Sequence, residues 1–256
     1  MSKKEYATVN VANKNAVVIG GTSGIGRAIS LAFADDGADV IATSRSEEAV
    51  ESTAEELRSR GAATAKVTCD VCKMESIERL YHVAARELGG VDILVNSAGS
   101  VAKAPITEME MADWELDIET NLTGIFRTCQ VFGREMDSGS IVNISSMSAG
   151  QAREQRPAYC AAKSGVNGLT RAAAADLGPR IRVNAIEPGF VETPLAGDAF
   201  ERGTDLRAQI DERTPLERVA QPEEIAGAAV YLASDAASFT TGETLTVDGG
   251  YDDSSL

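Results

Sequence analysis

A tyrosine and a lysine four positions apart are the first residues in this chain whose types suggest chemistry. They are Tyr159 and Lys163, in the sequence Y-C-A-A-K, within an alanine-rich segment at 158–177 that is predicted to be helical. Because four residues make just over one helical turn, both side chains lie on one face. An ammonium group there lowers the pKa of a phenol and makes tyrosine a better general base. An inert surface pair has the same spacing, so other residues must support this interpretation.

Three glycines near the N-terminus form a second candidate site. Gly20, Gly24 and Gly26 occur in I-G-G-T-S-G-I-G, between a predicted strand at 16–19 and a predicted helix at 25–36. Glycines at such a turn let the backbone approach a pyrophosphate closely, and the free N–H groups of the following helix attract phosphate oxygens. A turn without any ligand can contain the same glycines, but its position between a strand and an amphipathic helix favours a dinucleotide site.

Short apolar runs alternate with longer helical segments along the whole chain. Predicted strands occupy residues 16–19, 40–43, 66–68, 92–95, 140–144, 181–186 and 244–247. Predicted helices occupy residues 25–36, 46–61, 74–88, 112–136, 158–177 and 222–233. This alternation indicates an α/β fold, a Rossmann-type doubly wound parallel sheet with helices on both faces. We expect a single domain, 1–256, with an N-terminal extension at 1–13 and a substrate lid at about 190–213.

Four motifs resemble those of the short-chain dehydrogenase/reductase family, over about residues 14–251. The glycines match T-G-x-x-x-G-x-G, with Ile19 in place of the threonine, and N-S-A-G at 96–99 matches N-N-A-G. Y-x-x-x-K matches at Tyr159, and P-G-x-x-x-T matches at Pro188. The resemblance implies NAD(P)-dependent hydride transfer between a nicotinamide and a carbinol carbon, which interconverts a secondary alcohol and a ketone.

The same resemblance implies roles for four residues. Ser146, thirteen residues before Tyr159, corresponds to the family's serine, and Asn121, in N-L-T-G, corresponds to its fourth catalytic member. Tyr159 would exchange the proton, Lys163 would lower its pKa and bind the nicotinamide ribose, and Asn121 would support a water-linked proton path. Ser146 and Tyr159 would also bind the substrate. Ser145 is a rival for Ser146, but the spacing favours Ser146.

The end of the second predicted strand bears on the choice between NAD and NADP. Relatives that prefer NAD usually carry an aspartate there, whereas this chain has Ser44 and Arg45. The guanidinium group can bind a 2′-phosphate that no carboxylate repels, so NADP is favoured over NAD. The alternative is that Arg45 is a solvated loop charge. The resemblance implies cofactor contacts from Gly20, Thr22, Ser23, Gly24, Ile25, Gly26, Ser44, Arg45, Asp70, Val71, Asn96, Ala98, Gly99, Tyr159, Lys163, Pro188, Gly189, Val191 and Thr193.

Charged residues surround the predicted substrate end of the site. The lid segment has few large apolar residues, and Q-A-R-E-Q-R-P brings Arg153 and Arg156 to the border of the site. Arginines there suit a carboxylate or phosphate, although solvated surface charges give the same pattern. Several stretches, S-S-M-S-A among them, resemble gluconate and deoxy-sugar-acid dehydrogenases and also 3-oxoacyl-thioester reductases. We favour a sugar acid, deoxy-sugar acid or polyol as substrate. A reductase of acyl carrier protein or CoA thioesters and a non-catalytic nucleotide-binding regulator are the alternatives.

The net charge of −15 argues against several partners. Such a charge repels nucleic acid and anionic lipid, and no apolar run is long enough to span a membrane, so we expect only a small-molecule substrate. Only 7 of the 24 basic residues are lysines, which suggests adaptation to high salt, although an ordinary acidic bacterial protein has the same features. The segment 1–13 lacks the apolar core of a secretory signal, and we expect a cytoplasmic protein.

The cysteines and the single histidine do not suggest a metal site. Cys69 and Cys72 form a lone C-x-x-C, and no second pair completes four zinc ligands. A redox pair is the alternative to reduced thiols. His82 is the only histidine and lies far from the other motifs, which disfavours a Ser-His-Asp hydrolase. The family resemblance also implies a homotetramer, formed through the helices at 112–136 and 158–177 and through the last strand.

Overall fold

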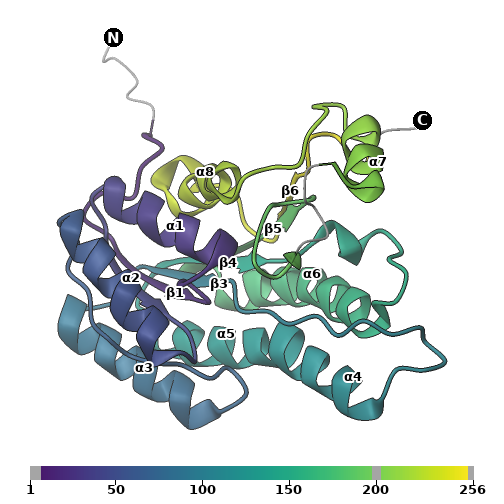
Figure 1. Ribbon diagram of the computed structural model, residues 1–256. Coiled ribbons are helices and arrows are strands. Elements are labelled where there is room, and N and C mark those ends of the chain that lie inside the picture. The colour runs from purple at the N-terminus through teal and green to yellow at the C-terminus, as the bar shows by residue number, and fades with distance from the viewer. Residues whose placement is uncertain (1–6, 198–202, 253–256) are drawn as a thin grey trace.

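The computed structural model describes residues 7–197 and 203–252, which form a six-stranded parallel sheet. The strands lie in the order β2-β1-β3-β4-β5-β6 (Figure 1). The strand order reverses between β1 and β3, and the carboxyl ends of strands at such a point are where open α/β sheets bind ligands. The bounds are β1 Asn15–Ile19, β2 Asp39–Thr43, β3 Ile93–Asn96, β4 Gly139–Ile144, β5 Ile181–Pro188 and β6 Thr244–Val247.

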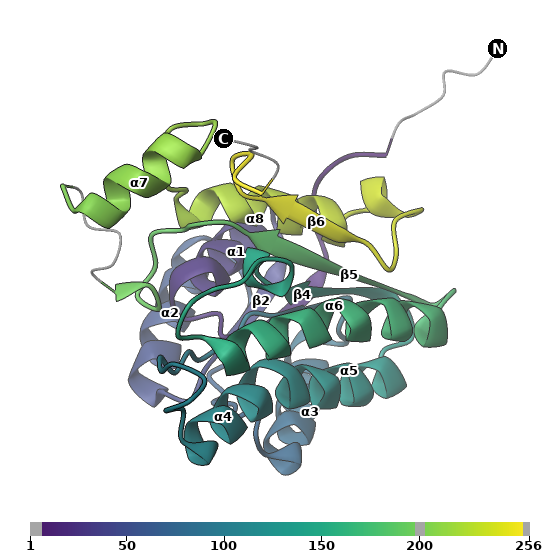
Figure 2. The same ribbon diagram turned by 90° about the vertical axis from the view of Figure 1, so that its right-hand side faces the viewer.

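Helices cover both faces of the sheet, which confirms the predicted α/β, Rossmann-type, doubly wound arrangement (Figures 1 and 2). The helices of one face are α1 (Gly24–Asp35) and α8 (Pro222–Ala233), with α2 (Glu47–Ser59) beside β2. The helices of the other face are α3 (Met74–Leu88), α5 (Gly124–Glu135) and α6 (Pro157–Leu177). Two further helices are α4 (Met111–Ile118) and α7 (Asp205–Arg213).

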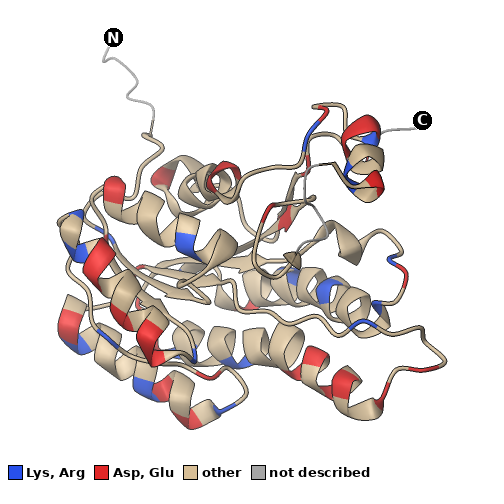
Figure 3. Cartoon of the chain, viewed as in Figure 1, with Lys and Arg blue, Asp and Glu red and all other residues tan. Residues whose placement is uncertain are grey.

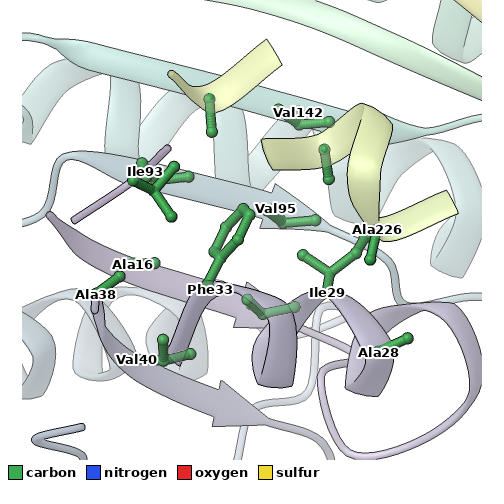
Figure 4. Close-up of a cluster of buried hydrophobic side chains, with 14 of the residues drawn as sticks. Ala16, Ala28, Ile29, Phe33, Ala38, Val40, Ile93, Val95, Val142 and Ala226 are labelled. Carbon is green, nitrogen blue, oxygen red and sulfur yellow. The ribbon is translucent and has the colours of Figure 1, made fainter. Parts of the chain in front are cut away.

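Each central strand contributes alternate residues to two hydrophobic layers. In β1, Ala16 and Val18 face the layer of α1 and α8, whereas Val17 and Ile19 face the layer of α3, α5 and α6. Figure 4 shows the ring of Phe33, on α1, lying against the strands of the first layer. A strand buried on both faces is apolar throughout, which is why continuous apolar runs predicted these strands correctly.

The strand predicted at 66–68 is wrong, because no strand is assigned in the described stretch between α2 and α3. The chain runs beside β2, and its backbone bonds to that region lie near its two ends, where Ala63 accepts and Cys69 donates, each at 3.0 Å. Between them, the Thr43 hydroxyl donates to the Val67 carbonyl at 2.6 Å. A side-chain hydroxyl thus satisfies a carbonyl that a regular ladder would pair, and the sheet has six strands instead of seven.

The helix predicted at 112–136 is interrupted in the middle. A π-helical turn, η1 (Glu119–Thr123), separates α4 from α5 and contains Asn121. The side-chain amide of Asn121 donates to the carbonyl of Asp117 and to that of Ser100, both at 2.9 Å. A side chain that takes a carbonyl four residues back competes with the helical ladder, and π turns often occur at functional sites.

The segments expected at the margins of the domain are described in part. Within the extension at 1–13, residues 7–13 are described, and Val11 is fully buried against the core. Within the lid at about 190–213, residues 198–202 lie outside the described residues. In the described part of the chain, no helix is long and apolar enough to cross a membrane, and no cluster of three acidic, cysteine or histidine side chains could hold a metal.

Candidate active site

A cavity of about 400 Å³ lies at the carboxyl ends of β1, β3, β4 and β5, where the fold predicts a ligand. The glycine turn after β1 and the polar residues after β4 border this same cavity. The residues predicted from the sequence that line it are Gly20, Thr22, Ser23, Gly24, Ile25, Ser44, Arg45, Asp70, Val71, Ala98, Gly99, Ser146, Tyr159, Lys163, Pro188, Gly189, Val191 and Thr193. Motifs far apart in the sequence therefore meet in one space.

Three of the predicted site residues lie behind the cavity wall: Gly26, Asn96 and Asn121. Gly26 belongs to the first turn of α1 and packs against the glycine turn before it. The side-chain amide of Asn96 donates to Asn143 at 2.9 Å, and its oxygen accepts from the Thr128 hydroxyl at 2.8 Å. Asn96 thereby joins β3 to β4 and α5. In this structure these residues support the wall and do not form its surface.

Ser146, Tyr159 and Lys163 lie close together although they come from two elements. Ser146 follows β4 and caps a short 3-10 turn, η2 (Met147–Ala149), by accepting the backbone N–H of Ser148 at 3.1 Å. Tyr159 and Lys163 lie on α6, with the Lys163 Nζ 5.5 Å from the centre of the Tyr159 ring. The side chains of Ser146 and Tyr159 border the same cavity. A substrate oxygen between these two hydroxyls would contact both.

The end of β4 holds the side chain of Lys163 in place. Its Nζ donates to the carbonyl of Ile144 at 2.8 Å, and the residue is only 3% exposed. Burial lowers the pKa of Lys163 to about 8, while the negative charge of Asp117 acts in the opposite direction. The ammonium form therefore predominates at neutral pH and is lost on moderate alkalinisation.

Burial raises the pKa of Tyr159, so the net lowering expected next to Lys163 is not found. Loss of water around the ring is the largest cause. The hydrogen bond from Ser146 and the positive charge of Arg156 act in the opposite direction but do not prevail. The sequence shows which charges are near a phenol and does not show how completely the fold removes it from water.

Ser145 and Ser146 point to different partners. The Ser145 hydroxyl donates to the Asn167 side chain at 2.7 Å and lies 3.3 Å from the carbonyl of Lys163, so it ties the end of β4 to α6. Ser146 instead acts on Tyr159, whose pKa it lowers against the larger effect of burial. The choice of Ser146 over its neighbour stays a prediction.

The glycine turn leaves no room for side chains. Gly20 has a φ of +77°, and a Cβ there would lie 2.5 Å from the backbone nitrogen of Ala98. A Cβ on Gly26 would lie 2.1 Å from the Gly20 carbonyl oxygen. Ser23, the N-cap residue of α1, makes no side-chain capping bond, which leaves N–H groups of the first turn available to an anion. This is the geometry that a pyrophosphate requires.

The end of β2 adds two polar groups to the same cavity. The hydroxyl oxygen of Ser44 is buried and has no hydrogen-bond partner among the described residues, and Arg45 is exposed beside it. A buried hydroxyl without a partner is unfavourable unless a ligand supplies one. Together with the glycine turn, these residues fit a dinucleotide: backbone N–H groups for the pyrophosphate, and a hydroxyl and a guanidinium for the adenosine ribose and its 2′ substituent.

Several residues of the site were not identified from the sequence. Asp117 is 1% exposed and accepts from the Ser100 hydroxyl at 2.7 Å and the Ala102 N–H at 3.0 Å. Its place four residues before Asn121 was an available signal, because residues so spaced share a helical face. Phe190 directly follows the P-G motif. The cavity is also lined by Met147 and Ser148 after β4 and, from the expected lid at about 190–213, by Pro194, Leu195 and Ala196.

Known proteins resemble this chain over nearly its whole length. Residues 20–252 match the family described as enoyl-(acyl carrier protein) reductase. The chain is 42% identical over 244 residues to D-threitol dehydrogenase of Mycolicibacterium smegmatis, covering 93% of this chain and 92% of that protein. It is also 42% identical over 245 residues to cis-4-hydroxycyclohexanecarboxylate dehydrogenase of Sinomonas cyclohexanicum, covering 94% and 97%.

A solved structure shares the fold closely. It is described as an NAD(P)-dependent gluconate 5-dehydrogenase of Beutenbergia cavernae with NADP bound at low occupancy, and it is 38% identical to this chain. The TM-score is 0.90, and the match covers 96% of this chain and 99% of that chain. The chain therefore belongs to the short-chain dehydrogenase/reductase family. It is an NAD(P)-dependent oxidoreductase that acts on hydroxyl and ketone groups.

Proposed function

We propose that this enzyme interconverts a secondary alcohol and a ketone on a sugar acid, deoxy-sugar acid or polyol, with NADP as its preferred cofactor. The proposed catalytic residues are Asn121, Ser146, Tyr159 and Lys163. The observation that carries the proposal is that the serine, tyrosine and lysine border the same cavity as the glycine turn. The dinucleotide that this turn fits would supply or accept the hydride. The residues of the chain bind the substrate and move the proton.

The proton is exchanged at the Tyr159 hydroxyl. In ketone reduction, Ser146 holds the substrate oxygen and Tyr159 donates its proton to that oxygen. In alcohol oxidation, the phenolate takes the proton back. The raised pKa of Tyr159 keeps it in the acid form needed for reduction, and the Ser146 bond and the Arg156 charge stabilise the phenolate that is left. Lys163, held at Ile144, is proposed to bind the nicotinamide ribose, and Asn121 to support a water-linked proton path.

The preference for NADP rests on Ser44 and Arg45. Both line the cavity, and no carboxylate side chain occupies the position of Ser44. A guanidinium can form charge-assisted bonds to a 2′-phosphate, which NAD lacks. The bound NADP of the gluconate 5-dehydrogenase structure is consistent with this preference.

The names of the relatives support the substrate class. D-Threitol is a polyol, whereas gluconate and cis-4-hydroxycyclohexanecarboxylate are hydroxy acids. All three carry secondary hydroxyl groups on compact polar molecules. The alternative, reduction of 3-oxoacyl thioesters, is supported by the acyl carrier protein in the description of the matching family. A non-catalytic regulator would not need Ser146, Tyr159 and Lys163 together.

Assembly into a homotetramer is part of the proposal. Met111 and Leu116 on α4 and Phe126 on α5 are exposed large apolar residues, on the helices expected to form an interface. β6 is an edge strand with partly exposed Leu245 and Val247, and proteins usually cover such edges. Light scattering in molar salt and in dilute buffer tests this, and a monomer in molar salt would contradict it. The cytoplasmic location stays a prediction.

The function is tested by following reduced nicotinamide absorbance with both cofactors and a panel of substrates. The panel contains sugar acids, polyols, simple secondary alcohols and an acetoacetyl thioester. We expect oxidation of hydroxy acids or polyols with NADP at a higher kcat/KM than with NAD. Reduction of the thioester alone would support the alternative. Cofactor binding without turnover of any compound would support the regulator and contradict the proposed function.

A further inference from the structure

Arg153 borders the cavity, and two aromatic rings hold its guanidinium group. The Cζ of Arg153 is 4.3 Å from the centre of the Phe190 ring and 5.7 Å from the centre of the Tyr251 ring. The two rings themselves meet edge to face, with centres 5.0 Å apart. A planar guanidinium stacked in this way is oriented before any ligand arrives, so that little freedom is lost when it binds one.

The nitrogen atoms of Arg153 are poorly satisfied by the protein. Its Nη2 is 3.2 Å from the sulfur of Met147, which is a weak acceptor, and its buried Nε has no hydrogen-bond partner among the described residues. A buried charged donor without an acceptor is unfavourable, and natural proteins rarely retain one without a reason. Two other arginines of the described chain show the contrast, since Arg207 and Arg218 are both paired with carboxylates.

Other positive charges gather around Arg153. Arg156 lines the same cavity, and the Cζ of Arg213 is 4.3 Å from the centre of the Tyr251 ring. Burial lowers the pKa of Arg153, and the charges of Arg156 and Arg213 act in the same direction while Tyr251 acts in the opposite one. Elsewhere the chain, with a net charge of −15, spreads acidic side chains over outer helices such as α2, α3 and α4 (Figure 3). A group of arginines without carboxylate partners among the described residues therefore marks this part of the site as a position for an anion.

We propose that Arg153 binds a carboxylate of the substrate while Ser146 and Tyr159 hold the reacting oxygen. A guanidinium presents two parallel N–H groups that match the two oxygens of a carboxylate, and the buried Nε of Arg153 is one such donor. The inference rests on the proposed function and narrows it: the substrate is a hydroxy acid or keto acid, and a neutral polyol is a poorer substrate.

The phosphates of the cofactor are not the anion in question. Their proposed place is the glycine turn after β1, with Arg45 after β2 for the 2′-phosphate, and both line the cavity. Arg153 instead precedes α6 and packs on Phe190, which follows β5. The carboxylate group is thus bound by residues that follow β4 and β5, apart from those that form the phosphate turn.

A binding measurement tests the inference without requiring turnover. The full-length protein is saturated with NADPH, so that an added alcohol cannot pass its hydride to the cofactor. Calorimetry then compares two acids, D-gluconate and cis-4-hydroxycyclohexanecarboxylate, with their neutral carboxamides. We expect at least one acid to bind roughly 10- to 100-fold more tightly than its amide, the difference that charge-assisted bonds provide. Equal binding of acids and amides would overturn the inference.

Variants assign the preference to one residue. Arg153→Met should abolish the acid-over-amide preference, and Arg153→Lys, which keeps the charge but not the planar fork, should retain part of it. Arg171→Met removes the same charge from an exposed position of α6 and should retain the full preference. Circular dichroism and NADPH binding show whether each variant is folded. If Arg153→Met weakens acid and amide alike while Arg153→Lys restores nothing, the inference is wrong.

The same compounds separate this inference from the proposed function. With NADP, the ratio of kcat/KM for acid over amide should fall about 10- to 100-fold in Arg153→Met and stay constant in Arg171→Met. Acid-selective binding that depends on Arg153, with no oxidation of any alcohol, would refute the proposed function and support the carboxylate site. Efficient oxidation of neutral alcohols with no acid preference would support the proposed function and refute the carboxylate site.

Discussion

The cofactor end and the substrate end of the cavity are built in different ways. After β1, the wall is backbone, and a Cβ at Gly26 would lie 2.1 Å from a carbonyl oxygen. After β4 and β5, the wall consists of side chains on loops, among them Met147, Arg153 and Phe190. A wall of backbone tolerates little change and recognises a shape that all dinucleotides share. Side chains on loops can be replaced without disturbing the sheet, so one fold can serve many substrates.

Tyr159 and Lys163, two of the proposed catalytic residues, line the cavity between these two ends, and burial affects both. Burial raises the pKa of Tyr159 and lowers the pKa of Lys163 to about 8, so in both cases it favours the neutral form. We propose that the cofactor end binds through hydrogen-bond geometry and the substrate end through charge, whereas the residues between them depend on the shielding of their ionisable groups from water. Changes in the three parts should therefore give three different kinds of defect.

The largest effect is expected for Tyr159→Phe, between the cofactor end and the substrate end of the cavity. The change removes only the hydroxyl that is proposed to exchange the proton, so kcat should fall about 100- to 10,000-fold, the usual contribution of general acid–base catalysis. NADPH binding, measured by fluorescence, should stay within a few-fold of wild type because the glycine turn is untouched. Activity close to that of the wild type would remove Tyr159 from the mechanism.

The next effect concerns the backbone wall, with Gly26→Ala. The new methyl group would overlap the Gly20 carbonyl and push the glycine turn out of place, and such overpacking costs about 1–3 kcal/mol. NADP and NAD affinities should fall together, because both share the pyrophosphate. Gly227→Ala is the matched control, since this exposed glycine of α8 has no atom within 4 Å of an added Cβ. Unchanged cofactor affinity in Gly26→Ala would mean that the turn adapts.

A smaller and more selective effect is expected for Arg45→Ala. The lost guanidinium should weaken NADP binding by about 1.5 kcal/mol, or roughly tenfold, and leave NAD binding nearly unchanged. Arg86→Ala on α3 removes an exposed charge far from the cavity lining and serves as the control. Equal losses for both cofactors would show that Arg45 acts through the fold or the overall charge. A wild type that uses only NAD would contradict the NADP assignment.

The fold was predictable because its strands and glycines leave strong local patterns. The apolar run around Val17 predicts a strand buried on both faces, and Gly37, with its positive φ, marks the end of the first helix. The incorrect prediction of a strand at 66–68 shows the limit of such local patterns. Its composition is that of a strand, yet a side-chain hydroxyl from Thr43 takes the place of ladder bonds, and such a long-range partner has no local signature.

The parts of the site that were predictable are those whose geometry follows from the spacing of residues along the sequence. Tyr159 and Lys163 share a helix, so four residues of separation determine their relation. The pKa of Tyr159 was mispredicted because burial is a property of the whole fold. The pairing of Arg153 with Phe190 and Tyr251 was not predictable either, because three separate segments must first be brought together in space.

The smallest effect is expected for Asp117→Asn, which tests how a buried charge sets the pKa values of Tyr159 and Lys163. Asp117 is buried, and its negative charge raises the pKa of both Tyr159 and Lys163. The change keeps the size of the side chain and an oxygen to accept from Ser100. Removing the negative charge makes the phenolate easier to form and the ammonium easier to discharge, so both pKa values should fall.

The pH profile gives the sign of this prediction. Alcohol oxidation needs the Tyr159 phenolate, so the rising limb of kcat against pH should move to lower pH in Asp117→Asn, with kcat at its optimum changed by less than about tenfold, or 1.4 kcal/mol. Asp113→Asn removes the same charge from an exposed position of α4 and should leave the profile in place. If Asp117 only anchored the neighbouring loop through Ser100 and Ala102, the variant would lose stability or activity without moving the limb, and the electrostatic role would be refuted.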